Sequence, residues 1–258
     1  MKKTIVIITL VLIGLAAHSQ ILITLLLGDK LNSDKLEFGL EGGLNWSRIS
    51  AFEASKYHGD WNLGFYFNFQ LHPSWYINTG VLVKSTLGAG QLTDNDLSSL
   101  NATIFKDSDG FRVEGNYSQQ MNYFLVPVLV KHKFKNNFYL ELGPQFGLMY
   151  RSWIQFDSDL EGRDAIIKEY NREKLNKIDA GLTLGAGYRL FKGTGWTLGA
   201  KYYYGFVNVY KGKQGSNNSS FFLKMNIPIG AGEKAKEKAA QKAERKRQKK
   251  AARQSKKE

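Results

Sequence analysis

The sequence predicts an all-β fold, an eight-stranded antiparallel up-and-down transmembrane β-barrel. Three observations lead to this prediction. Apolar and polar residues alternate with a period of two along eight segments, short and long connections alternate between these segments, and charged residues keep to the polar face. A mean hydropathy of −0.35 excludes a polytopic helical membrane protein. It does not exclude a barrel, in which only alternate residues face lipid.

The composition narrows the function classes. A chain of 258 residues suits a single barrel domain, and its lack of Cys excludes disulfide scaffolds, thiol catalysis and Cys-based zinc sites. The formal net charge is +13, but twelve Lys and Arg against four Glu in 233–258 concentrate much of it at the C-terminus. The basic balance is therefore no argument for a nucleic-acid groove on the fold.

The N-terminus is typical of an exported protein. A basic start and the apolar run 5–17, followed by small residues around a cleavage position, predict a secretory signal peptide over 1–19. Residues 20–35 then form an N-terminal leader segment, either amphipathic or disordered. Its apolar part, 21–27, leaves an uncleaved anchor over 5–27 open as the alternative.

The barrel is predicted over 36–230. Its segments have about the 9–11 residues that a tilted strand needs to cross a bilayer. Three prolines lie inside them, Pro127, Pro144 and Pro228, and we expect bulges or rim positions there because a closed barrel has no free edge. The predicted strands are 36–46, 61–71, 75–86, 121–132, 138–150, 178–190, 196–206 and 221–229.

The connections sort by length. Those after the second, fourth and sixth strands are short, and those after the first, third, fifth and seventh are long. An outer-membrane barrel has this pattern, with tight periplasmic turns and longer extracellular loops. An even strand number then places both termini in the periplasm. The short connections are 72–74, 133–137 and 191–195, and the long ones are 47–60, 87–120, 151–177 and 207–219.

The charged residues of the strands are expected to point inward, because Lys or Arg on the lipid face at mid-bilayer costs about 2–4 kcal/mol. The strand 121–132 is apolar on both faces, and Lys131 is placed inward by assumption. An eight-stranded barrel is just wide enough for its side chains to fill it, so balanced charges should pair and plug the lumen. The alternative is a conducting path. The expected lumen charge cluster comprises Glu37, Glu41, Lys84, Lys131, Glu141, Asp179, Arg189, Lys201 and Lys224.

Aromatic residues gather at both ends of the predicted strands, as at the two interfaces of a membrane. The alternative is the aromatic core of a soluble barrel. The expected membrane-interface aromatics are Trp75, Phe138 and Trp196 beside the short turns, and Trp46, Trp61 and Tyr150 beside the long loops.

Little in the sequence indicates catalysis. His58 and Asp60 suggest a base with its orienting carboxylate, but no nucleophile accompanies them. We therefore expect no enzyme, no catalytic residue, no cofactor and no metal site. The acidic loop 93–115 leaves open a cation site or recognition surface on one side, and a solvated shield on the other.

The basic C-terminal tail, 231–258, is expected to be a charged helix or a solvated coil in the periplasm. One hypothesis is attachment to anionic lipid headgroups or to cell-wall polymer. The alternative is a solubilising extension. A nucleic-acid partner does not fit the compartment.

Several of these segments resemble the outer-membrane protein beta-barrel domain family, the PorT-like porins. The resemblance covers about 27–229 and implies a barrel in the outer membrane of a Gram-negative cell. Many members of that family lack an assigned activity, and the basic tail departs from its pattern. The segments that carry the resemblance are 27–32, 35–43, 123–131, 179–188 and 201–208.

The predicted function is a structural or interaction role in the cell envelope, with outer-membrane lipid and an envelope protein as partners. The lumen is expected to be closed by paired charges. Three alternatives stay open: a narrow pore or transporter for small solutes, a soluble periplasmic binding barrel, and a component of a secretion or envelope-assembly complex.

Overall fold

A computed structural model describes residues 35–53, 56–160, 163–193 and 195–229. The predicted signal peptide, nearly all of the leader segment and the basic tail lie outside the described residues. The elements are β1 (Leu36–Ile49), β2 (Lys56–His72), β3 (Trp75–Lys84), β4 (Thr86–Gly90), α2 (Asp94–Ser99), β5 (Asn116–Lys133), β6 (Phe138–Leu160), β7 (Arg163–Tyr170), η1 (Arg172–Lys174), β8 (Ile178–Arg189), α3 (Leu190–Gly193), β9 (Thr197–Asn208) and β10 (Asn217–Pro228).

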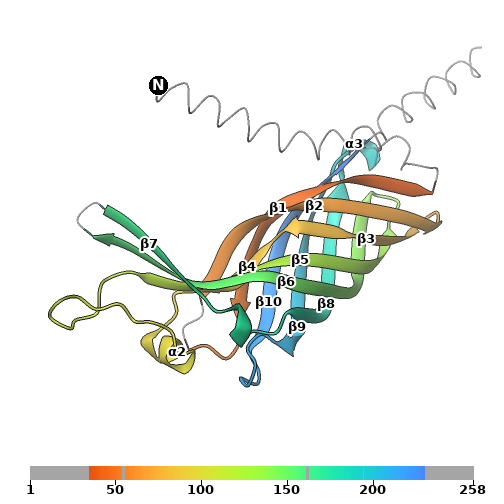
Figure 1. Cartoon of the computed structure of the whole chain (residues 1–258). Helices are drawn as coiled ribbons and strands as arrows, with labels where there is room; N and C mark the ends of the chain where they lie inside the picture. Colours follow the sequence, from red (N-terminus) through yellow and green to blue (C-terminus); the bar gives the residue numbers. More distant parts are fainter. Residues whose placement is uncertain (1–34, 54–55, 161–162, 194, 230–258) are drawn as a thin grey trace, which may run out of the picture.

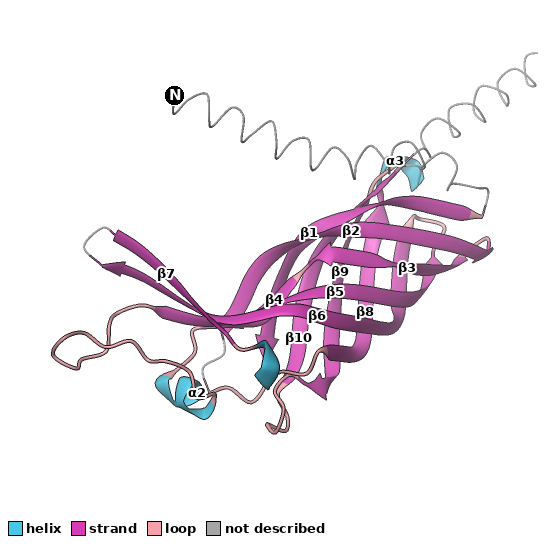
Figure 2. Cartoon of the chain, viewed as in Figure 1, coloured by secondary structure: helices cyan, strands magenta, loops and turns pink. Residues whose placement is uncertain are grey.

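Antiparallel strands close into one ring of hydrogen bonds (Figures 1 and 2). β1 pairs with β2 on one side and with β10 on the other, which closes the barrel. β3 and β4 are two pieces of one wall position, since both pair with β2 and with β5. The wall continues through β6, β8 and β9 to β10. The ring therefore has eight positions, which confirms the predicted eight-stranded up-and-down barrel.

Alternation along the strands produces the two faces of the wall. In β5, Phe124, Val126, Val128 and Val130 are exposed on the outside, whereas the residues between them are buried. Lys131 belongs to the buried set. Because the two faces of β5 are both apolar, only the closure of the ring distinguishes them.

The connections lie at opposite ends of the barrel (Figure 1). The turn after β2, the turn after β5 and the α3 connection are at one end, which is called the short-turn end here. The long connections are at the other, the loop end, where α2 also lies. None of the helices in the described ranges is long and apolar enough to cross a membrane.

One long connection is more ordered than the sequence analysis expects. β6 has 23 residues and continues past the barrel wall, where it pairs with β7 as a projecting hairpin (Figure 1). The region predicted as a loop over 151–177 is therefore largely a two-stranded ribbon. The apolar residues of this region alternate as in a strand, but the charged residues between them are typical of a loop.

The expectation for the prolines is partly wrong. Pro228 ends β10 at the rim, as expected. Pro127 and Pro144 sit inside the ladders of β5 and β6, and the register on either side of each is unchanged. Proline keeps the extended backbone at the cost of one donor, so no bulge is needed. The register shift of this strand pair falls between Asn122 and Tyr123 instead.

Candidate functional site

The barrel lumen holds most of the polar side chains that the chain buries. Of the predicted lumen charge cluster, Glu41, Lys131, Glu141, Asp179, Lys201 and Lys224 are buried. Glu37, Lys84 and Arg189 are half-buried near the two ends. All nine side chains have polar partners, and the partners differ from layer to layer.

The middle layer is built around Glu141 of β6. Its carboxylate pairs with the Lys224 ammonium from β10 and lies 3.9 Å from the Lys131 ammonium from β5. Lys131 also stands 3.9 Å from the ring centre of Tyr139. Burying a carboxylate without a partner costs several kcal/mol, so two cations around one acid stabilise the arrangement.

A second pair completes this layer. Lys201 of β9 donates to Glu41 of β1 at 2.8 Å, and the Asn226 amide donates to the other carboxylate oxygen at 3.1 Å. Both ionic side chains are almost completely buried. The middle of the lumen is therefore filled by long side chains from β1, β5, β6, β9 and β10.

Two glycines make room for the aromatic part of this layer. A Cβ atom at Gly187 or Gly199 would collide with the Tyr139 hydroxyl. Because both positions lack a side chain, the Tyr139 ring lies across the inner wall of β8 and β9. It presents its face to Lys131 and Lys224, which adds a cation–π attraction to the ion pairs.

The layer near the short-turn end centres on Glu37. The Arg189 guanidinium donates to one carboxylate oxygen at 2.5 Å. Tyr66 and Asn68 donate to the other oxygen, each at 3.0 Å. Asn78 in turn donates to Asn68 at 2.7 Å. Both carboxylate oxygens of Glu37 are thus used, one by the adjacent strand β2 and the other by β8 across the lumen.

Two members of the predicted cluster depart from a scheme of acid–base pairs within the lumen. Lys84 pairs at 2.7 Å with Asp60, which the sequence analysis considers only as an orienting carboxylate for His58. Asp179 accepts from Asn218 at 2.7 Å and has no ion pair among the described residues. Asp179 lies next to the buried Tyr123 and Tyr203 rather than next to a base.

A hydrophobic cap closes the loop end of the barrel. We use this name for a buried apolar cluster that connects the lumen, at the loop end, to the long loops. The sequence analysis describes 93–115 only as an acidic loop and misses the cap. Its members from the connections are Leu92, Leu97, Leu100, Leu175, Val209 and Tyr210, and strand residues such as Ile49, Tyr117, Met121, Met149 and Phe156 pack against them.

Buried hydrogen bonds fasten the cap. The Tyr210 hydroxyl donates to the Gln119 side-chain oxygen, to which Asn171 also donates at 2.7 Å. Ser152 donates to Asn171 at 2.7 Å. A capping box of Thr93 and Asp96 holds the start of α2, which carries Leu97 into the cluster. The loops therefore pack into a small apolar core at this end, and the polar side chains among them are hydrogen-bonded.

The predicted membrane-interface aromatics lie on the outside of the wall. Trp61, Trp75, Phe138 and Trp196 are exposed, and Trp46 and Tyr150 are half-buried against neighbouring rings. Trp75 begins β3, Phe138 begins β6 and Trp196 precedes β9, all at the short-turn end.

Asp60, which the sequence analysis pairs with His58, is held by other groups. The Asp60 carboxylate is engaged by Lys84 and by the backbone N–H of Trp61 at 2.7 Å. Among the described residues, no group of three or more His, Asp or Glu is placed to hold a metal ion.

Comparison with known proteins identifies the family. The model of a family described as outer membrane protein beta-barrel domain matches residues 29–211. Among the curated proteins, none matches this chain.

Similar solved structures include three bacterial proteins. Ail, the attachment invasion locus protein of Yersinia pestis, is 12% identical, with a TM-score of 0.37 over 76% of this chain and 100% of that chain. Neisserial surface protein A is 9% identical, with a TM-score of 0.37 over 74% and 97%. OprG from Pseudomonas aeruginosa is 10% identical, with a TM-score of 0.33 over 75% and 93%.

Proposed function

Since the chain belongs to the outer membrane protein beta-barrel domain family, we propose that it serves the envelope as an outer-membrane barrel with a closed lumen and a structural or interaction role. One observation carries the proposal: the buried ion pairs of Glu41 and Glu141 lie across the middle of the lumen. An eight-stranded barrel leaves room for little more than its own side chains. The hydrophobic cap adds a second obstruction at the loop end.

The test combines two measurements on refolded protein. Heat-modifiable gel mobility reports whether the barrel is folded, and planar-bilayer recording reports whether it conducts. We expect a mobility shift with no steady conductance. Discrete openings of the wild-type protein would contradict the closed lumen.

A matched variant shows whether the ion pairs are the seal. Replacing both Glu41 and Lys201 by alanine removes a pair without leaving either partner uncompensated. We expect openings in this double variant only. The corresponding double alanine variant of the exposed pair Arg112 and Asp94 is the control, because it lies outside the lumen.

The interaction role is supported by the hairpin of β6 and β7. β7 is the last strand of the sheet, and within the described residues its outer edge has no strand partner. Ile166 and Tyr170 expose 62% and 66% of their surfaces there. Such an edge suits an extended segment of an envelope protein that pairs through its backbone. A photo-crosslinker at Lys168, compared with one at Lys135, tests for a contact specific to the hairpin.

The placement of the chain in the membrane follows from the same proposal. The short-turn end faces the periplasm, so both termini are periplasmic, and the predicted aromatics mark the two interfaces. Residues 1–19 act as the signal peptide, 20–35 as a leader, 36–230 as the barrel and 231–258 as a basic tail that binds anionic headgroups or cell-wall polymer. Protease added to intact cells should leave a tag after residue 258 uncut.

A narrow pore for small solutes is the second candidate, and the half-buried layer around Glu37 and Arg189 is the observation that favours it. A partly open short-turn end is what an entrance to a narrow pore requires.

The proposed role includes no catalysis, in keeping with the sequence analysis, in which no nucleophile accompanies His58 and Asp60. Co-purification of a stable partner would instead favour a part in a secretion or assembly complex.

A further inference from the structure

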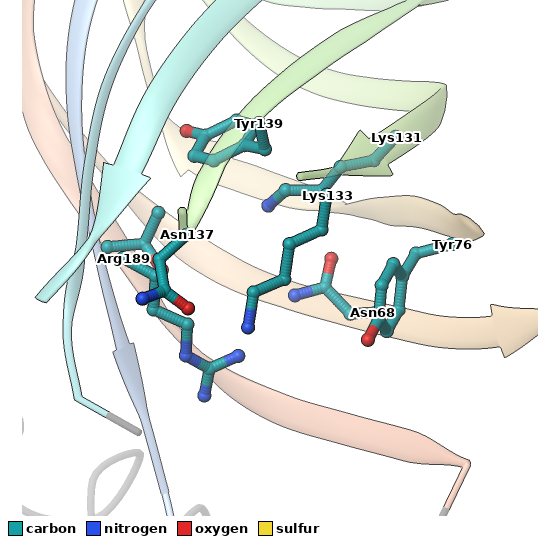
Figure 3. Close-up of a pocket in the computed structure, with 8 residues that line it drawn as sticks. Asn68, Tyr76, Lys131, Lys133, Asn137, Tyr139 and Arg189 are labelled. Carbon is teal, nitrogen blue, oxygen red and sulfur yellow. The ribbon is translucent and has the colours of Figure 1, made fainter. Parts of the chain in front are cut away.

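A small cavity lies inside the barrel at the short-turn end (Figure 3). Its volume of about 20 Å³ exceeds the roughly 10–15 Å³ that one water-sized particle needs. The side chains that line it come from six strands and one turn. They are Asn68, Tyr76, Lys131, Lys133, Asn137, Tyr139, Arg189 and Thr197.

Three cationic side chains surround this cavity, and no carboxylate lines it. Arg189 forms an ion pair with Glu37. Lys131 shares Glu141 with Lys224, and its distance of 3.9 Å from that carboxylate is too long for a hydrogen bond. The nearby acids therefore do not balance the nearby bases.

Lys133 is the cation with the least compensation. It is half-buried at the end of β5, and within the described part of the chain its ammonium makes no hydrogen bond or ion pair. The Nε atom of Arg189 is also buried without a hydrogen-bond partner in that part. In Figure 3 the charged ends of Lys133 and Arg189 reach into the same space.

Positive charge that is held away from water and left unmatched is costly, and an anion between the cations removes that cost. Polar side chains without a charge of their own complete the lining. The Asn137 amide and the Thr197 hydroxyl belong to the cavity and make no side-chain hydrogen bond within the described residues. Both groups are able to donate to an anion.

We propose that this cavity is a binding site for one small monovalent anion, held by Lys133, Lys131 and Arg189. The cavity has room for about one water-sized particle, which suits a small anion such as chloride. The site lies in the lumen on the short-turn side of the buried pairs of Glu41 and Glu141, and it shares Lys131 and Arg189 with the lumen charge cluster. The proposal of an anion site does not depend on whether the barrel conducts.

Chloride is the probe. The line width of the ³⁵Cl NMR signal is measured on the refolded full chain in uncharged micelles, with a bulky sulfonate keeping the ionic strength constant. We expect a broadening above that of empty micelles. Lys133→Met should weaken chloride binding by about tenfold or more, because a charge-assisted hydrogen bond is lost.

Lys135→Met is the matched control. Lys135 is an exposed lysine two residues along the same turn and does not line the cavity. This variant should bind chloride like the wild type, and Lys133→Arg should keep most of the affinity. Equal losses in the two methionine variants would overturn the site, since they would mean general attraction to surface charge.

Crystals grown in bromide provide a measurement that needs no variant. An anomalous peak between Lys133 and Arg189 is expected. A map with no peak in the cavity would overturn the proposal even if the solution signal broadens.

Discussion

The two ends of the barrel interior are filled by different chemistry. From the middle to the short-turn end, the strands supply ion pairs and amides, with Glu141 and Glu37 at the centre of each layer. At the loop end, Leu97, Leu175 and Tyr210 from separate loops form the hydrophobic cap. Both arrangements fill the interior with side chains, but ion pairs require exact partners whereas apolar contacts do not.

This difference predicts how the lumen and the cap each tolerate substitutions. An ion pair in a lumen needs both partners, because removal of one leaves a buried charge. An apolar cap loses contact area in proportion to what is removed, and its loops can shift to fill part of the space. We therefore expect the lumen to respond sharply to single substitutions and the cap to respond gradually.

The largest effect is expected for Glu141→Gln. This change leaves both Lys131 and Lys224 without their shared acid and should lower the free energy of unfolding by about 3–5 kcal/mol. Urea unfolding of protein refolded in lipid vesicles measures it. Glu173→Gln, at an exposed position in η1, is the control. If the two variants are equally stable, the lumen does not depend on its ion pairs.

A somewhat smaller effect is expected for Leu97→Ala in the cap. Leu97 is fully buried, and its truncation should cost about 2–5 kcal/mol of local stability. The loops should become sensitive to protease while the barrel keeps its heat-modifiable mobility. Ser98→Ala, on the exposed side of the same helix, should change neither property. Loss of the folded barrel would show that the cap is not a separate unit.

Tyr210 tests the polar fastening of the cap. Tyr210→Phe removes the donor to Gln119 and should cost about 0.5–1.5 kcal/mol. Burial raises the pKa of Tyr210 in the folded protein, whereas the unfolded value is about 10. Its contribution is therefore present below pH of about 10 and is lost as the pH rises further. Proteolysis between pH 8 and 11 should show a steeper alkaline loss for the wild type than for the variant.

The smallest effect is expected where an ion pair is partly exposed. Lys84 and Asp60 keep 30% and 21% of their side-chain surfaces accessible. Lys84→Met should lower the free energy of unfolding by no more than about 1 kcal/mol. Urea unfolding under the conditions used for Glu141→Gln gives the comparison. A loss as large as that of Glu141→Gln would mean that burial does not separate the two pairs.

The wall of the barrel was predictable because its signal is local. Every second residue of a strand faces lipid, so the alternation and the position of Lys224 or Arg189 within it can be read along the chain. The closure of the ring also determines which face of β5 points inward, because both faces of this strand are apolar and its sequence alone does not distinguish them.

The cap was not predictable in this way. Its loop members are single residues in three different connections, such as Leu97, Leu175 and Val209, and no period connects them. Only the fold brings them together. The capping box before Leu97 was a detectable sign of an ordered loop. Asp60 as the partner of Lys84 was hidden for the same reason, since the two meet only through the pairing of neighbouring strands.

The length of β6 has a mechanical consequence. At about 3.3 Å per residue, its 23 residues extend roughly 75 Å, more than twice the hydrocarbon thickness of a bilayer. The same backbone that forms the wall also forms one arm of the hairpin. A pull on the hairpin tip therefore acts along the strand, and the ladders to β5 and β8 bear that load together in shear. The barrel wall can therefore serve as an anchor for tension applied to the hairpin.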